Sequence, residues 1–205
     1  MTPIRYLVFD FGRVLIRYEP DEITEAIAGR EDLRLLSDLL FGEELWGGLD
    51  AGRLTNEEAT RIACERLPER LHAKAAAIYR DWIDHIPPIP GMHELVASLA
   101  SRGVPLFLLS NISVYFAEHA DRFPVLSHFK KCIFSGVCRM MKPNADIYHY
   151  MLSECGIPAD ETLFIDDNPQ NIAAARACGI HGYLFDGDVP RLRAHLSDLF
   201  GGEPL

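Results

Sequence analysis

The sequence has no excess of positive charge and no long apolar run. Its 20 lysine and arginine residues are outnumbered by 30 aspartate and glutamate residues, for a formal net charge of −10. Nucleic acids and anionic membrane surfaces bind basic faces, so we expect neither as a partner. No apolar stretch approaches the roughly 18 residues of a transmembrane helix. Residues 1–18 place Asp10, Arg13 and Arg17 among their apolar residues, which is unlike a secretory signal peptide.

Cysteine pairs and metal-binding histidine motifs are also missing. The five cysteines form no C-x-x-C pair, and the eight histidines show no H-E-x-x-H spacing. This pattern indicates a reduced chain, which we expect to be cytoplasmic, rather than a disulfide scaffold or a zinc protein. With 48% hydrophobic and 24% charged residues, the chain has the composition of a globular protein with its own core.

The sequence does contain five short apolar runs, each ending at a polar residue. They cover residues 6–9, 105–109, 132–134, 162–165 and 182–185. Runs of this length without alternation are typical of strands buried on both faces. Helical patterns lie between them, and Gly103, Gly156 and Gly179 follow three of these patterns as C-terminal stops. Strands that alternate with helices predict an α/β fold with a doubly wound parallel sheet.

A long helical stretch interrupts this alternation after the first strand. We expect four helices, at residues 21–28, 32–40, 56–66 and 68–85. A proline-rich linker at residues 86–91 follows them. The spacing of Thr55 and Glu58 is that of a capping box, which starts the third helix. The predicted domains are a core of residues 1–15 and 86–205 and a helical insert of residues 16–85.

Polar residues at the strand ends are the candidates for chemistry, because open parallel sheets bind ligands outside the carboxyl ends of their strands. Four runs are followed by Asp10, Ser110, Ser135 and the pair Asp166-Asp167. Any one of these residues alone is more typical of a turn or a helix cap. Their types complement one another, so we expect the set to form one site.

The acid pair indicates a metal, and a lysine indicates an anion. Adjacent carboxylates such as Asp166 and Asp167 repel each other unless a cation offsets them, and Mg²⁺ prefers such oxygen ligands. The alternative is a solvated turn in which Asp167 caps the next helix. Pro143 holds Lys142 extended before a helix, from where it can reach an anion or a carboxylate. The alternative for Lys142 is an ordinary surface position.

Ser110 is followed by Asn111, so a hydroxyl and the next backbone N–H can form a small anion clamp. The alternative is again a helix cap.

In chain order, the candidates resemble the four motifs of the haloacid dehalogenase superfamily, which consists mostly of phosphatases. The matching segments are residues 7–15, 107–111, 142–144 and 163–168. The resemblance covers nearly the whole chain and implies that the helical insert is a cap domain.

The resemblance also implies roles for individual residues. Asp10 is the implied nucleophile, which forms an aspartyl-phosphate, and Lys142 is the implied catalytic lysine. The implied Mg²⁺ ligands are Asp10, the Gly12 carbonyl, Asp166 and Asp167, and the implied phosphate-binding residues are Phe11, Gly12, Ser110, Asn111 and Lys142. Trp46 and Asp50 lie near a glycine-rich turn of the insert and, with Arg13, are candidate substrate contacts. Ordinary packing, or solvent exposure for Arg13, is the alternative.

Position 12 departs from the family pattern. Most phosphatases of the family carry an acid–base aspartate there, where this chain has Gly12. The pattern resembles the subgroup of a bacterial glucose-1-phosphate phosphatase and of the phosphatase domain of epoxide hydrolases, except that Arg13 replaces the usual asparagine. The missing acid favours substrates whose leaving oxygen needs little protonation. A water, Tyr18, Glu19 or Asp50 are the substitutes that the sequence leaves open.

The sequence therefore predicts a magnesium-dependent phosphatase, monomeric or weakly dimeric, that hydrolyses a small phosphomonoester such as a sugar phosphate. Three alternatives remain. A 2-haloacid dehalogenase uses an aspartate nucleophile but needs no metal and no paired acid. A phosphomutase needs an acid–base group, and the usual one is absent because position 12 is glycine. A catalytically weak binding protein of the same fold is the third, because one motif residue is missing.

Overall fold

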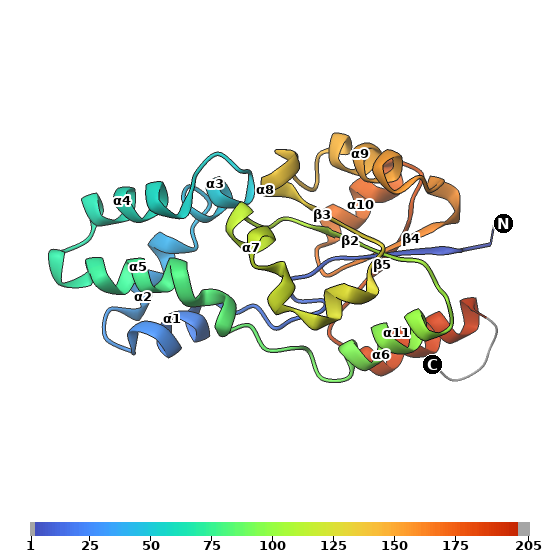
Figure 1. The fold of residues 1–205 in the computed structure, drawn as a ribbon, viewed down its shortest axis with the longest axis horizontal. Coiled ribbons are helices and arrows are strands. Elements are labelled where there is room, and N and C mark those ends of the chain that lie inside the picture. Colours follow the sequence, from blue (N-terminus) through green and yellow to red (C-terminus); the bar gives the residue numbers. More distant parts are fainter. Residues whose placement is uncertain (1–2, 201–205) are drawn as a thin grey trace.

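A five-stranded parallel sheet lies at the centre of the protein, whose structure is a computed structural model that describes residues 3–200 (Figure 1). In chain order the strands are β1 (Tyr6–Phe9), β2 (Leu106–Ser110), β3 (Lys131–Phe134), β4 (Thr162–Asp166) and β5 (His181–Leu184). They are arranged as β3-β2-β1-β4-β5, and all pairings are parallel. The predicted α/β class is confirmed, and the strand order reverses beside β1, where such sheets bind ligands.

Alternate residues of the strands belong to two separate cores. On β1, Leu7 and Phe9 face α6 (Met92–Ser101) and α11 (Val189–Leu199). Val8 faces the other side, which α9 (Ala145–Cys155) and α10 (Pro169–Ala177) cover. Successive side chains of a strand point to opposite faces, so a strand covered on both sides must be apolar throughout. This is why the strands appear in the sequence as continuous apolar runs.

Five helices between β1 and α6 form a lobe beside the sheet (Figure 1). They are α1 (Pro20–Ala28), α2 (Leu33–Leu40), α3 (Trp46–Asp50), α4 (Asn56–Arg66) and α5 (His72–Asp81). Their buried side chains join the same hydrophobic cluster as Leu7 and Phe9. The predicted capping box starts α4, since Thr55 Oγ1 accepts from Glu58 N–H at 3.2 Å and Glu58 Oε2 accepts from Thr55 N–H at 2.9 Å.

Two segments connect the lobe to the sheet, and they lie side by side. Arg17 N–H donates to Pro87 O at 2.7 Å, and Ile89 N–H donates to Leu15 O at 3.1 Å. The proline-rich linker therefore pairs with the segment that leaves β1. Both crossings of the chain between lobe and sheet occur at this one place.

The structure differs from the sequence-based expectation in its shorter helices. The helix expected at residues 68–85 is reduced to α5 by a 3-10 turn at each end. In the core, α7 (Val114–Glu118) has only five residues. Two further helices were missed, α3 and α8 (Ser135–Cys138). With five and four residues, they are too short to show a helical period.

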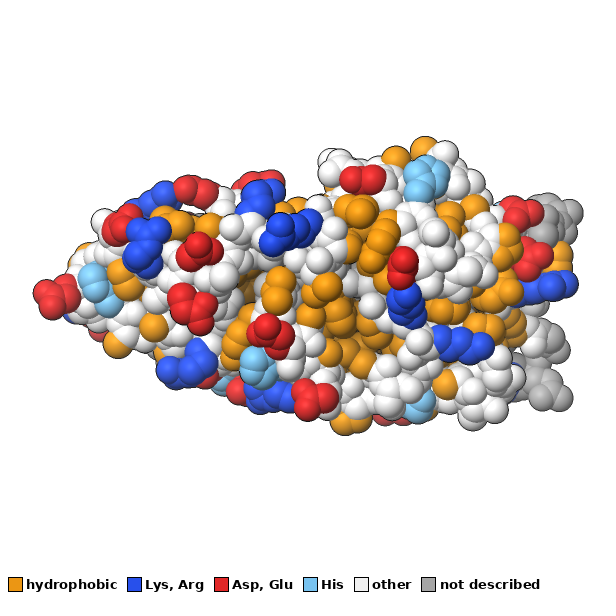
Figure 2. Space-filling view, turned by 45° about the horizontal axis from the view of Figure 1, so that its top comes forward, with side chains coloured by type: hydrophobic (Ala, Val, Ile, Leu, Met, Phe, Trp, Pro, Cys, Tyr) orange, Lys and Arg blue, Asp and Glu red, His pale blue; other side chains and the backbone are white. Residues whose placement is uncertain are grey.

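The surface carries mixed charge. On the face drawn in Figure 2, basic and acidic side chains are interspersed over the helices and do not gather by sign. Within residues 3–200, no helix is both long enough and apolar enough to cross a bilayer.

Candidate active site

The carboxyl ends of β1, β2 and β4 bring the predicted residues together. Asp10 follows β1, Ser110 ends β2, Asp166 ends β4, and Lys142 reaches them from the segment before α9. The Lys142 Nζ lies 2.8 Å from Asp10 Oδ1 and 2.7 Å from Asp166 Oδ2, and it also donates to Leu109 O at 3.0 Å. The Lys142 side chain is 1% exposed and that of Asp166 is fully buried. The lysine thus bridges the first and fourth motifs in a site closed to solvent.

Burial and mutual charge shift the pKa values of this group. Burial raises the pKa of Asp10 to about 7; the charge of Lys142 opposes the rise and that of Asp166 adds to it. Burial alone would lower the pKa of Lys142, but the charges of Asp10 and Asp166 outweigh it and raise that pKa. Lys142 therefore stays a cation. Asp10 needs further positive charge to be fully ionised at neutral pH.

Asp10, Asp166 and Asp167 form a set that fits a hard cation. One carboxylate oxygen of each lies within 4.8 Å of the others. Burial raises the pKa of Asp167, and the charge of Asp166 raises it further. A divalent cation offsets this repulsion, and half-buried Asp167 leaves room for the waters that Mg²⁺ retains. The donor set therefore fits Mg²⁺.

The start of α10 fixes the orientation of Asp166. Its Oδ1 accepts from Asn168 N–H at 2.8 Å, and Asn171 Nδ2 donates to both carboxylate oxygens, at 3.1 and 3.0 Å. Asn171 is a site residue that the sequence pattern did not predict. Its place in the first turn of α10, five residues after Asp166, is the signal that identifies it.

Asn111 holds the main chain of Lys142 with its side chain. Its Oδ1 accepts from Lys142 N–H at 2.9 Å, and its Nδ2 donates to Lys142 O at 2.8 Å. From the sequence, only the backbone N–H of Asn111 was expected to have a role. The second role was missed because the two residues are 31 positions apart.

The loop after β1 orients the nucleophile candidate. Phe11, a residue implied to bind phosphate, donates its N–H to Asp10 Oδ1 at 2.7 Å. The Phe11 ring is buried, with its centroid 4.7 Å from that of Phe116. At Gly12, a Cβ would meet no atom within 4 Å and φ is not positive. The backbone at position 12 therefore accepts a side chain, so its conformation alone does not require glycine.

Arg13 connects this loop to the segment that leads into α1. Its Nε donates to Tyr18 O at 3.1 Å, and its Nη2 lies 3.4 Å from Glu19 Oε2. The Arg13 side chain is 50% exposed. With Asp167, Arg13 lines a cavity of about 340 Å³. Arg13 thus lies on the solvent side of the acid pair.

The lobe contacts the sheet through backbone atoms near Asp50. Asp50 O accepts from Ser135 Oγ at 2.5 Å, and the same Oγ accepts from Ile112 N–H at 2.8 Å. Gly52 approaches Gly136 so closely that a Cβ on Gly52 would lie 2.2 Å from Gly136 O. The end of α3 is therefore held over the carboxyl ends of β2 and β3.

Trp46, a predicted substrate contact, is part of an aromatic cluster in the lobe. Its ring centroid lies 4.5 Å from that of Phe41, 5.0 Å from Trp82 and 5.9 Å from Tyr18. Trp46 is 9% exposed. The structure gives it a packing role, and its contact with substrate stays a prediction.

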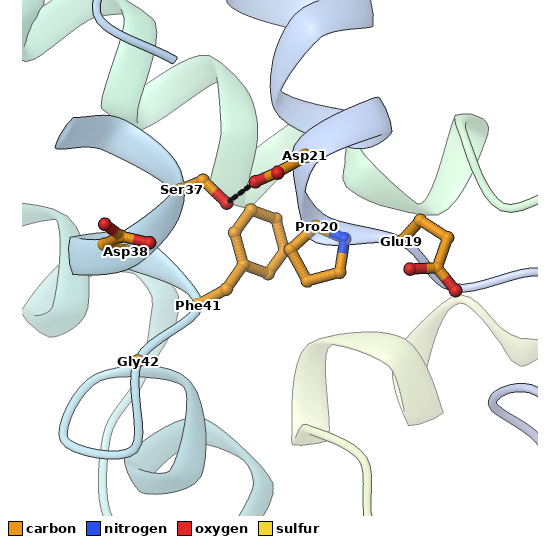
Figure 3. A pocket seen from close by; sticks show the side chains of 7 residues that line it. All are labelled: Glu19, Pro20, Asp21, Ser37, Asp38, Phe41 and Gly42. Carbon is orange, nitrogen blue, oxygen red and sulfur yellow. Dashed lines mark hydrogen bonds between the residues drawn. The ribbon is translucent and has the colours of Figure 1, made fainter. Parts of the chain in front are cut away.

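A separate hollow of about 410 Å³ on the lobe is acidic (Figure 3). It is lined by Glu19, Pro20, Asp21, Ser37, Asp38, Phe41 and Gly42. Ser37 Oγ donates to Asp21 Oδ1 at 2.7 Å, and Asp21 also pairs with Arg34 at 3.0 Å. The three carboxylates at this hollow, those of Glu19, Asp21 and Asp38, repel anions.

Comparison with known proteins identifies the family of this chain. The family model of the haloacid dehalogenase-like hydrolases matches residues 4–179. The chain therefore belongs to the haloacid dehalogenase-like hydrolases, as the order of its motifs predicted.

Similar proteins include two fungal relatives and one bacterial structure. The chain is 26% identical over 190 residues to a sesquiterpene phosphatase from Aspergillus oryzae, covering 88% of this chain and 89% of that protein. It is 26% identical over 207 residues to a drimenol cyclase from Aspergillus calidoustus, covering 97% of this chain but only 37% of the cyclase. A haloacid dehalogenase family enzyme from Bacteroides thetaiotaomicron, in complex with magnesium and inorganic phosphate, shares the fold. Its TM-score is 0.71 at 23% identity, covering 92% of this chain and 98% of that one.

Proposed function

We propose that the protein is a magnesium-dependent phosphatase that hydrolyses small phosphomonoesters through an aspartyl-phosphate at Asp10. The observation that carries the proposal is the buried Lys142 between Asp10 and Asp166, with Asp167 beside them. The similar sesquiterpene phosphatase and the magnesium and phosphate bound to the similar Bacteroides enzyme support it.

The residues divide the reaction among them. The Asp10 carboxylate, oriented by Phe11 N–H and Lys142 Nζ, attacks phosphorus in line as the bond to the leaving oxygen breaks. Lys142, the Ser110 hydroxyl and the Asn111 N–H bind the phosphoryl oxygens and stabilise their charge. Water then attacks phosphorus and frees the Asp10 carboxylate.

Asp10, Asp166, Asp167 and the Gly12 carbonyl would hold the metal. Bound there, Mg²⁺ supplies the positive charge that offsets the repulsion between the carboxylates and the phosphate. Position 12 needs only a backbone oxygen for this role, so glycine keeps that ligand.

We also propose that residues 16–85 act as a cap over the core of residues 1–15 and 86–205. Asp10 is only 9% exposed, and α3 is held over neighbouring strand ends. Substrate entry then requires the lobe to move about the paired linkers, as lids do in many enzymes.

The proposed function is tested by the turnover of an aryl phosphate. We expect hydrolysis to fall to background in EDTA and to return when magnesium is added in excess. Turnover that is unchanged in EDTA contradicts the metal-dependent mechanism and supports the dehalogenase-like alternative.

A further inference from the structure

The main chain of Asp50 is tied to the strand ends that carry the phosphate-binding residues. Ser135 Oγ links Asp50 O at 2.5 Å to Ile112 N–H at 2.8 Å. Ile112 directly follows Ser110 and Asn111, the proposed anion clamp. With the lobe closed, Asp50 therefore sits above the edge of the sheet where phosphate is expected.

The side chain of Asp50 contains a buried oxygen with no partner. Among residues 3–200, no group forms a hydrogen bond with Asp50 Oδ1, although the atom is shielded from solvent. Buried polar atoms are nearly always paired, so such an atom calls for a ligand that completes it. A substrate oxygen in the closed site is a suitable partner.

The charges that act on the Asp50 carboxyl belong to the active site. Burial raises the pKa of Asp50 well above its usual range, the charge of Asp10 raises it further, and the charge of Lys142 opposes the rise. These effects favour the neutral carboxylic acid. A neutral carboxyl near the nucleophile has a proton to give.

The other two groups that the sequence leaves open are less suited to this task. Glu19 is 46% exposed at its side chain and pairs with Arg13. Burial raises the pKa of the Tyr18 hydroxyl well above its usual range, which makes it a weak proton donor. Neither residue has a buried carboxyl oxygen without a partner, as Asp50 has in its Oδ1.

We infer that Asp50 protonates the leaving oxygen, in place of the acid that is missing at position 12; this inference rests on the proposed phosphatase function. As Asp10 attacks phosphorus, the bond from phosphorus to the leaving oxygen breaks and its electron pair stays on that oxygen. The Asp50 O–H proton passes to the oxygen, so the alcohol leaves and Asp50 becomes a carboxylate. Asp50 then takes a proton from the water that attacks phosphorus, the bond from phosphorus to Asp10 breaks, and phosphate departs.

The test measures single-turnover release of the alcohol or phenol from phosphate esters of graded leaving-group acidity. The magnesium-loaded wild type is compared with Asp50→Asn, which keeps the size and the main-chain bond to Ser135 but has no acidic proton. We expect the variant to be about 10²–10⁴-fold slower on alkyl phosphates. On the ester of the most acidic phenol the two rates should nearly agree, so the dependence on leaving-group pKa becomes steeper in the variant.

Three control variants separate Asp50 from its neighbours. Asp38→Asn alters an exposed aspartate of the same lobe, and it should keep the shallow wild-type slope. Tyr18→Phe and Glu19→Gln should keep it too. A wild-type slope in Asp50→Asn, or a steep slope in Tyr18→Phe or Glu19→Gln instead, overturns the assignment.

Failure of the inference differs from failure of the proposed function. If the wild type does not hydrolyse even the most activated aryl phosphate with magnesium, the phosphatase function is wrong and the inference falls with it. If the wild type is active and the slopes are equal, only the role of Asp50 is wrong. Should Asp50→Asn not fold, Asp50→Glu against Asp50→Gln gives the same comparison, with the steep slope expected in the glutamine variant.

Discussion

Lys142 forms ion pairs with both Asp10 and Asp166, so a substitution of Asp10 leaves the lysine with one partner. Asp10→Asn removes the nucleophile but leaves Lys142 paired with Asp166 at 2.7 Å. It also removes a buried carboxyl whose pKa is raised to about 7, which is a sign that its charge is unfavourable there. We expect turnover below roughly 1% of wild type, because an amide cannot form the acyl-phosphate. The thermal unfolding midpoint should not fall.

The measurement combines phosphatase rate with thermal unfolding. Asp38→Asn, an exposed aspartate outside the site, is the control and should retain both activity and stability. An Asp10→Asn variant that keeps about a tenth of the wild-type rate removes Asp10 from the nucleophile role. A variant that unfolds at a much lower temperature contradicts the view that the Asp10 charge is unfavourable in the folded state.

At the scale of elements, the contact between α3 and α8 positions the lobe. Gly52 has a φ of +65°, and a Cβ there would lie 2.2 Å from Gly136 O. Gly29, in the same lobe, has a φ of +79° but open space around a Cβ. Alanine at either position adds about 1–2 kcal/mol of backbone strain, but only at Gly52 does it push the lobe off the sheet.

We therefore expect Gly52→Ala to lower kcat/KM by about 10- to 100-fold, because displacement of the lobe by the added Cβ misaligns the groups of the site. Gly29→Ala should lose similar stability and keep its activity. The check is kcat/KM and unfolding midpoint for both variants. Equal activity of the two would show that closure at Gly52 does not affect the reaction.

The sequence predicts the strands well and the contacts between distant elements poorly. The run at residues 162–165 becomes β4 because a strand covered on both faces has to be apolar, which is a local signal. The missed helices α3 and α8 are joined by the bond between Ser135 and Asp50, which are 85 positions apart. Periodicity carries no information at that separation, and the Asn111 clamp on Lys142 was missed for the same reason.

The strand-end rule nevertheless predicted which residues the fold brings together. Asp10, Ser110 and Asp166 lie at neighbouring strand ends, as the sequence predicts. Lys142 points toward carboxylates, as the argument from Pro143 predicts. The burial of the Asp50 carboxyl oxygen could not be foreseen, because it depends on how the lobe closes. The sequence pattern predicts the residues at the strand ends, whereas the packing of the lobe determines which further side chains lie near them.

For the whole molecule, we expect the acidic site to make stability depend on pH and on magnesium. The pKa of Asp10 is raised from 3.8 to about 7 in the folded state, so in this range the folded protein binds a proton more tightly than the unfolded chain. The stability of the metal-free protein therefore falls as pH rises from about 4 to about 7. The raised pKa values of Asp50 and Asp167 act in the same direction.

Magnesium should raise the unfolding midpoint, and more so at pH 7 than at pH 5, because it binds the ionised carboxylates. The midpoint of the wild type is measured at both pH values with magnesium and with EDTA. Asp167→Asn, which removes one of the three carboxylates, should need more magnesium for the same rise. An unfolding midpoint that is the same with magnesium and with EDTA at pH 7 contradicts the proposed metal site.

The central claim is that phosphate passes through a covalent bond to Asp10. The most direct measurement is to acid-quench the magnesium-loaded enzyme during turnover of an aryl phosphate and to locate the phosphoryl group by peptide mass spectrometry. We predict a phosphoryl group on Asp10 in the wild type, and none in Asp10→Asn or in EDTA. Release of phosphate with no phosphoryl group on Asp10, or with one on another residue, would contradict the mechanism.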